Sequence, residues 1–270
     1  MKYLLFIVVL VAGLITAGCV GGKQTSVVTP THIAMTSPPQ IITPIPTTLP
    51  VKPAPNVTSK YSQEEGIAYF EEIALGFEYG KTNEVVYRYS KDPVKIQIMG
   101  VPDSESRACL NTEISDFNAI SERTKVSLTS DNNYKIQINF TPKSEFLRKC
   151  GTPGSSGCFF VNINPSLPGE LRGALIEIGT DNSTKPTFRC HVIREELTQS
   201  LGFGKDSRDE SPYEDSVFHH HNGPWTTSYS EMDKYLIRML YNSDVPVNAT
   251  KEEVEDYFKR NPQIMKKVLS

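Results

Sequence analysis

One long stretch of this sequence lacks the side chains needed to build a core, and it confines any folded structure to the rest of the chain. Residues 20–63 contain no Asp or Glu, and eight of the nineteen prolines lie within residues 30–55. Such a segment cannot bury enough apolar surface to fold. Its Pro and Thr content favours an extended chain with a reach of up to ~120 Å, so we predict that residues 19–60 form a stalk. One domain with a substantial core is expected over residues 61–270.

The first eighteen residues, 1–18, have the layout of a secretory signal peptide. Lys2 precedes an apolar run over residues 4–15. This run is shorter than the about 20 residues of a membrane-spanning helix. The string from Leu14 to Cys19, LITAGC, resembles the lipobox of prokaryotic lipoproteins. The resemblance implies cleavage before Cys19 and a lipid on its thiol, hence an extracytoplasmic domain anchored to the cell membrane. A short uncleaved anchor is the alternative, and it leaves the domain on the same side.

Charge and composition exclude some classes of partner. The net charge is −3, and no basic stripe runs through the sequence. Nucleic acid is therefore not an expected partner. The expected partners are the membrane, through the lipid on Cys19, and a surface protein or a glycan.

Four cysteines remain besides Cys19. Disulfides persist outside the cytoplasm, and four cysteines allow three connectivities. A loop rich in Gly and Ser separates Cys150 from Cys158 and could bring the two together. We therefore predict the disulfides Cys150–Cys158 and Cys109–Cys190. Metal-binding thiolates are disfavoured because the chain has no C-x-x-C spacing.

Hydrophobic periodicity predicts the order of the elements. Helical spacing of apolar side chains indicates helices over residues 63–78, 105–122 and 187–201, another from residue 230, and two short helices before the C-terminus. Runs of strand-forming residues, some of them alternating, indicate strands over residues 94–99, 126–129, 134–140, 159–163 and 174–178. Several consecutive strands between helices are typical of an α+β domain.

The helix predicted over residues 187–201 carries the side chains most suited to chemistry. Residues four apart lie on one helix face, so Glu195 and Gln199 point together, with His191 one turn earlier and Glu196 beside them. This spacing matches the zinc-peptidase pattern H-E-x-x-H-x-x-G-x-x-H. In that pattern two His bind the metal and the Glu acts on the bound water.

The similarity to peptidases extends beyond this helix. Residues 215–219, DSVFH, resemble the Met-turn region of matrixin-type metzincins, and residues 230–241 resemble their final helix. A closer resemblance, over about residues 90–245, is to the domain of unknown function family 2927. It rests on Glu195-Glu196, Gln199, Leu201-Gly202, Asp206, Ser216-Val217-Phe218, Asp233 and Leu240-Tyr241. The resemblance implies a metzincin-like, mixed and twisted sheet backed by two long helices, with a helical C-terminal part. It implies no particular reaction.

The departures from the peptidase pattern fall on the groups that the chemistry needs most. Glu195 stands for the first His, Gln199 for the second, Lys205 for the third and Phe218 for the turn methionine. Glu196, at the position of the general base, matches the pattern. Catalytic zinc sites normally keep three good ligands, and an ammonium group is not a ligand.

Three hypotheses follow. In the first, which the sequence favours, Lys205 takes the place of a metal and pairs with Glu195 or Glu196, so that the domain is a non-catalytic binding or structural module without a cofactor. In the second, Glu195, Glu196, Gln199 and Asp206 form an oxygen-rich site for calcium, magnesium or manganese. In the third, His191 or the run His219, His220 and His221 supplies the missing imidazoles. The chain is then a divergent peptidase that uses zinc or another divalent metal, with Glu196 as its general base.

Overall fold

The computed structural model describes residues 60–78, 82–90, 93–151, 155–180, 185–208, 210–219 and 225–269. The predicted signal peptide, Cys19 and the stalk up to residue 59 lie outside these residues, and so do His220 and His221. The chain divides into two units, 1–54 and 55–270, and the second contains every described residue. Within the described part of the chain, no helix has both the length and the apolar character that crossing a bilayer requires.

A mixed five-stranded sheet forms the centre of the domain, in the order β2-β1-β3-β5-β4. The strands are β1 (Val94–Met99), β2 (Val126–Thr129), β3 (Ile136–Thr141), β4 (Gly157–Ile163) and β5 (Leu171–Gly179). β1 pairs in parallel with β2 and β3, and β3 pairs in parallel with β5. β4 runs antiparallel to β5 at one edge. The α+β prediction with a mixed sheet is thus confirmed.

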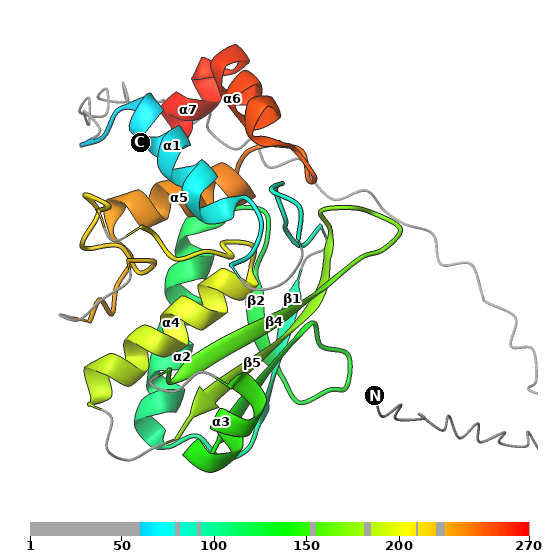
Figure 1. Ribbon diagram of the computed structural model, residues 1–270, viewed down its shortest axis with the longest axis vertical. Helices are drawn as coiled ribbons and strands as arrows, with labels where there is room; N and C mark the ends of the chain where they lie inside the picture. Colours follow the sequence, from blue (N-terminus) through cyan, green and yellow to red (C-terminus); the bar gives the residue numbers. More distant parts are fainter. Residues whose placement is uncertain are drawn as a thin grey trace, which may run out of the picture. The chain divides into compact units, whose positions relative to one another are not determined.

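Two long helices, α2 (Ser104–Ile120) and α4 (Pro186–Ser200), pack against each other along one face of the sheet (Figure 1). α4 contacts β4 and β5, and α2 contacts β2. The side chain of Asp103 caps α2 by accepting a hydrogen bond from the backbone nitrogen of Ser106 at 2.7 Å. Pro186 begins α4 at a position where its missing N–H costs nothing. These are the two backing helices that the sequence predicted.

Four further helices gather beyond one end of the sheet (Figure 1): α1 (Gln63–Ala74), α5 (Glu231–Tyr241), α6 (Lys251–Arg260) and α7 (Pro262–Val268). Capping boxes begin α1, α5 and α6, at Ser62, Ser230 and Thr250. Each box satisfies two backbone donors at a helix start. The helical C-terminal part agrees with the prediction, whereas the short helix α3 (Lys143–Cys150) was not predicted.

The core lies between the sheet and its helices. Alternate residues of the central strands turn inward, among them Ile96, Ile138 and Ile176, each at most 1% exposed. They form one cluster with apolar residues of α2 and α4, including Phe117 and Leu197. Because both helices bury their inner faces here, any polar side chain on those faces must find a partner within the protein.

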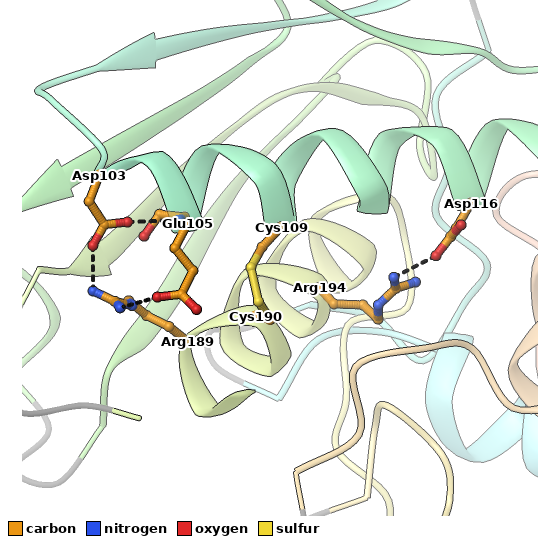
Figure 2. The surroundings of a disulfide bond; sticks show 8 residues. Asp103, Glu105, Cys109, Asp116, Arg189, Cys190 and Arg194 are labelled. Carbon is orange, nitrogen blue, oxygen red and sulfur yellow. Dashed lines mark hydrogen bonds and ion pairs between the residues drawn. A yellow bond between two sulfur atoms is a disulfide. The ribbon is translucent and has the colours of Figure 1, made fainter. Parts of the chain in front are cut away.

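Both predicted disulfides are present. Cys109–Cys190 joins α2 to α4, and Cys150–Cys158 joins the end of α3 to the start of β4. Figure 2 shows the first of these with the charged residues on either side of it. Arg189 of α4 contacts Asp103 at 2.6 Å and also Glu105, at the start of α2. The two helices are therefore joined covalently and by ion pairs.

Candidate functional site

The helix α4 carries the predicted site residues, and most of its surface is buried. It ends where Gly202 takes a φ of 117°, a conformation that residues with a Cβ rarely adopt. A Cβ at this position would also collide with the backbone oxygen of Tyr87. The chain therefore leaves the helix sharply at Gly202 and passes beside Phe77, which forms a parallel β-bridge with Gly204.

His191 is held in place by the loop that precedes α5. It is 2% exposed, and its Nδ1 lies 2.8 Å from the carbonyl oxygen of Thr226, to which it donates a hydrogen bond. Its ring also lies against Trp225, with 5.3 Å between the ring centroids. The other nitrogen, Nε2, lies 3.6 Å from Oε2 of Glu195, one turn further along the helix. The expected proximity of His191 and Glu195 is present.

The adjacent carboxylates Glu195 and Glu196 lie in different surroundings. The side chain of Glu195 is 18% exposed, and the residue Glu196 is 8% exposed. Glu196 packs against Gly157 at the start of β4, where a Cβ would lie under 3.0 Å from it. Of the described residues, none donates a hydrogen bond to the Glu196 carboxylate or forms an ion pair with it.

Burial and like charges act together on these two groups. Burial raises the pKa of Glu195 well above its usual value, and the carboxylates of Asp206, Glu196 and Glu78 raise it further. Burial likewise raises the pKa of Glu196, and Asp206 and Glu78 add to the effect. We call Glu78, Glu195, Glu196 and Asp206 the acidic cluster. Its members are close enough for their charges to repel one another.

Two of the positions where a zinc peptidase has His hold Gln199 and Lys205. Each of these side chains contacts an acidic side chain outside α4. Nε2 of Gln199 donates a hydrogen bond of 2.6 Å to Oδ1 of Asp206. Nζ of Lys205 lies 2.5 Å from Oε2 of Glu84. The predicted pair between Lys205 and the adjacent glutamates is therefore wrong. The cause lies in the backbone: Lys205 donates its N–H to Ile73 beside the end of α1, and its side chain crosses Gly76 toward Glu84.

His219, the described member of the histidine run, lies beside the segment that carries Asp206. Its backbone forms a parallel bridge with Ser207, and its Nδ1 lies 3.3 Å from the Ser207 hydroxyl. Asp233 of α5 holds the preceding turn, residues 216–218, by hydrogen bonds. Oδ1 of Asp233 accepts a hydrogen bond from the Ser216 hydroxyl at 2.6 Å, and Oδ2 accepts one from the Val217 backbone at 3.1 Å. Residues 216–218 and Asp233 thus form one structural unit.

A cleft of about 640 Å³ is lined by Phe77, Glu78, Glu84, Lys205, Asp206, Ser207, Arg208 and Glu210. We call it the Asp206 cleft. Glu78 and Asp206 of the acidic cluster lie in its wall, whereas no residue of α4 does. Both basic side chains in its wall have an acidic partner, Lys205 in Glu84 and Arg208 in Glu72.

The described residues at the ligand positions of the peptidase pattern do not fit a zinc centre. One of the expected ligand positions holds an amide that donates to Asp206, and another holds an ammonium group paired with Glu84. Zinc sites need several imidazole, thiolate or carboxylate ligands within about 2.0–2.3 Å of one point. Among the described ranges, no three His, Cys, Asp or Glu side chains converge in a way that could hold a metal ion.

A second polar group, which was not predicted from the sequence, lies between α2 and α4. Glu113 of α2 is 1% exposed, and its Oε2 lies 2.7 Å from Nη1 of Arg194. Arg194 also contacts Asp116 at 2.6 Å, as Figure 2 shows, and its guanidinium lies 4.5 Å from the ring centre of Tyr229. The Tyr229 hydroxyl and Thr198 donate hydrogen bonds to Oε1 of Glu113. This group ties α2, α4 and the loop before α5 together.

Burial has the largest effect on the pKa of Glu113. It raises the pKa of this carboxyl to about 7, although Arg194 and the hydrogen bonds act in the opposite direction. One pattern in the sequence could have predicted that Glu113 is buried and has a partner. Glu113 lies three residues after Leu110 and four before Phe117, on the buried stripe of α2, where a charged residue requires a partner.

The sequence matches one family of proteins. Residues 63–260 match the model of the family described as "Protein of unknown function (DUF2927)". The resemblance that the sequence indicated is confirmed, and it covers more of the chain than expected. No curated protein is significantly similar to the chain.

Solved structures of zinc proteases are similar to the chain at low identity. One structure of myroilysin has a TM-score of 0.37 and 14% identity, over 57% of this chain and 94% of that chain. A second myroilysin structure has a TM-score of 0.40 and 13% identity, over 68% and 98%. High choriolytic enzyme 1, a hatching enzyme zinc-protease from Oryzias latipes (medaka fish), has a TM-score of 0.35 and 12% identity, over 62% and 98%. Similarity at this level says nothing about the site.

Proposed function

The chain belongs to the DUF2927 family, and we propose that its domain is a degenerate metalloprotease-like module that binds a partner and does not cleave it. We further propose that a lipid on Cys19 holds the module at the outer side of a cell membrane, with residues 19–60 as a spacer. The observation that supports a binding role without catalysis is the loss of metal-ligand residues on α4 and just after it. Gln199 and Lys205 occupy two ligand positions of the peptidase pattern, and both are bound to other side chains.

The chemistry of these side chains supports a binding role. An amide oxygen is a weak zinc ligand, and a lysine ammonium repels a metal ion. A protein that needed zinc would have to break the Gln199 contact with Asp206 and expel Lys205 from its place beside Glu84. What remains is a cleft whose wall carries four acidic and two basic side chains, among them Asp206 and Lys205. Such a surface suits recognition of a ligand more than activation of water.

A divergent peptidase is the second candidate, and one observation favours it. Glu196 stands at the position of a general base, is 8% exposed and has a pKa raised by burial. Carboxylates with a raised pKa are common in catalytic sites. On this reading His191, which lies 3.6 Å from Glu195, and the His219 run would supply the metal ligands.

Metal analysis of the purified chain separates the two candidates. The chain is dialysed against zinc, then against buffer without a chelator, and its zinc content is measured by mass spectrometry. For a binding module we expect less than ~0.1 zinc per chain and no hydrolysis of casein. One zinc per chain that is lost in Glu195→Ala or His220→Ala, together with hydrolysis that is lost in Glu196→Ala, would establish the peptidase instead.

The proposed anchor has its own test. The layout of residues 1–19 supports lipidation of Cys19, and a Cys19→Ala variant would lack the thiol that carries the lipid. We expect the wild-type chain to incorporate labelled palmitate and to sediment with membranes, and the variant to do neither. Equal labelling of both chains would contradict the anchor without affecting the proposed role of the domain.

A further inference from the structure

A buried carboxylate on the outer face of the sheet holds an amine and an amide on the same oxygen. Ile138 and Ile176 turn toward α2 and α4, so the next residues, Asn139 of β3 and Glu177 of β5, face the opposite side. Glu177 is fully buried. Its Oε1 accepts hydrogen bonds of 2.9 Å from Nζ of Lys149, in the last turn of α3, and of 2.6 Å from Nδ2 of Asn139. A nucleophilic and an electrophilic group therefore meet at one proton acceptor.

The amide of Asn139 is oriented for attack by a nucleophile. Its Oδ1 accepts a hydrogen bond of 2.8 Å from Nε2 of Gln137, two residues earlier on β3. Oε1 of Gln137 in turn accepts one of 2.9 Å from the hydroxyl of Tyr134. A donor at the carbonyl oxygen of Asn139 polarises the carbonyl group and stabilises the negative charge that develops on this oxygen when a nucleophile adds to Cγ. The hydrogen bonds of both amides thus favour addition at Cγ of Asn139.

We propose that Lys149 and Asn139 form a covalent isopeptide bond, with Glu177 as the catalytic group that accepts and returns protons. The product is an amide between Nζ of Lys149 and Cγ of Asn139, and it joins α3 to β3. The next residue of α3, Cys150, is joined to β4 by the disulfide with Cys158. The end of α3 would then be attached to the sheet by two covalent bonds. This modification goes beyond the proposed function and does not depend on it.

The reaction is balanced without any co-reactant. Nζ of Lys149 adds to Cγ of Asn139, and the new C–N bond forms while the carbonyl oxygen takes up negative charge beside Gln137. The ammonium group of Lys149 gives up two protons through the Glu177 carboxylate. One proton reaches Nδ2 of Asn139, so that the Cγ–Nδ2 bond breaks and ammonia leaves. The other departs with the ammonia as ammonium, and no group is oxidised or reduced.

The ionisation of Lys149 affects the rate of this reaction more than its outcome. The hydrogen bond to Glu177 raises the pKa of the Lys149 amine, and Glu145 lies 3.1 Å from the same nitrogen. The neutral amine that attacks is therefore scarce, and the reaction is slow. Each molecule needs only one turnover, however, and reacting groups that are held together have effective concentrations on the order of 10⁵ M or more. The loss of ammonia to the solvent makes the step irreversible.

Peptide mapping of the full chain by mass spectrometry tests the proposal. The purified chain is reduced, alkylated and digested with trypsin, which cuts after lysine and arginine but not after an acylated lysine. A chain with the bond yields residues 136–143 joined to residues 149–172, with a mass about 17 Da below the sum of the two peptides because one ammonia has left. A chain without the bond yields residues 136–143 as a separate peptide. We expect the joined peptide as the main product of wild type.

Two variants separate the reaction from the ion pair. Lys149→Arg keeps a positive charge beside Glu177 but removes the nucleophilic amine. Glu177→Gln keeps the size of the side chain but removes the proton acceptor. Both should yield residues 136–143 as a separate peptide. The matched control is Lys143→Arg, at the exposed start of α3, which should yield the joined peptide in the wild-type amount.

A merely structural role of this polar group would leave every chain at full mass. A wild-type chain that yields only the separate peptide, even after prolonged incubation in mildly alkaline buffer, would overturn the proposal. A joined peptide that forms in Glu177→Gln in the wild-type amount would overturn the role of Glu177. The wild-type result is decisive by itself, so the test holds even where a variant fails to fold.

Discussion

Gly157 and Glu196 occupy one small volume between β4 and α4. The strand begins with a residue that has no side chain, and the carboxyl group of Glu196 lies where a side chain would be, next to Val192. Neither residue can change size without affecting the other, because protein interiors have little free space. The position of the Glu196 carboxyl group therefore depends on a glycine in a different element.

Substitution of this glycine measures the contact directly. In Gly157→Ala the new Cβ would lie under 3.0 Å from atoms of Glu196 and Val192, so we expect the free energy of unfolding to fall by about 1–3 kcal/mol in urea denaturation. Gly66→Ala is the matched control. Gly66 lies inside α1, and a Cβ there would meet only Met265, at 3.9 Å. Alanine at this position should raise the free energy of unfolding by about 0.5–1 kcal/mol. Wild-type stability of Gly157→Ala would mean that Glu196 does not pack against β4.

Glu196→Gln should stabilise the protein at high pH. The pKa of Glu196 is raised in the folded state above its ordinary 4.5, so its contribution to stability is fully present below pH 4.5 and is lost as the pH rises through the folded pKa. Glutamine carries no charge to bury. We expect Glu196→Gln to exceed wild type by about 1–3 kcal/mol at pH 8 and to equal it near pH 4.5.

Urea denaturation at several pH values gives this comparison, with Asp131→Asn, in the exposed turn after β2, as a control that should differ from wild type by less than about 0.5 kcal/mol throughout. A Glu196→Gln variant that is less stable than wild type at pH 8 would show that the carboxylate has a stabilising partner.

At the scale of elements, the joint between α2 and α4 determines where the acidic cluster lies. Three sets of contacts follow one another along it: Arg189 with Asp103 and Glu105, the disulfide Cys109–Cys190, and Arg194 with Asp116 (Figure 2). Arg194 also pairs with Glu113 of α2. They hold α4 in register with α2 over most of its length. Glu196, which packs against Gly157 of β4, is consequently carried by a fixed helix.

The two disulfides should contribute unequally to stability. Cys109 and Cys190 are 81 residues apart, whereas Cys150 and Cys158 are 8 apart. Loop entropy in the unfolded chain then predicts losses of about 4.5 kcal/mol for Cys109→Ser with Cys190→Ser and about 2.5 kcal/mol for Cys150→Ser with Cys158→Ser. Each double variant is compared with oxidised wild type by urea denaturation. Equal losses would indicate that contacts in the folded state, and not loop length, control the effect.

At the scale of the whole molecule, the second unit contains a core of its own. Among the described residues, the buried apolar cluster draws on residues between 67 and 268. Removal of residues 1–54 should therefore leave the thermal midpoint of unfolding within about 2 °C of that of the longer chain, as measured by circular dichroism. A decrease of more than about 4 °C would show that the first unit contributes to the stability of the second.

Much of the fold could be predicted because its signals are local. Alternating apolar residues revealed β1 and β3, helical spacing revealed α2 and α4, and capping residues marked the starts of α5 and α6. The short helix α3 was missed because it buries only Phe146, too little for a periodic pattern. The disulfide Cys150–Cys158 followed from a short flexible loop, and Cys109–Cys190 then followed because two cysteines remained.

The amino-acid sequence by itself determined which residue types stand on α4: carboxylates, an amide and a lysine where a zinc peptidase has imidazoles. Only the tertiary structure decided how these groups are paired. Lys205 lies beside Glu84 because the chain after Gly202 passes along the end of α1, and Glu113 meets Arg194 because two helices cross the same face of the sheet. Such contacts join residues about 80 to 120 positions apart, and their energies depend on distance and burial in space, which no local pattern in the sequence contains.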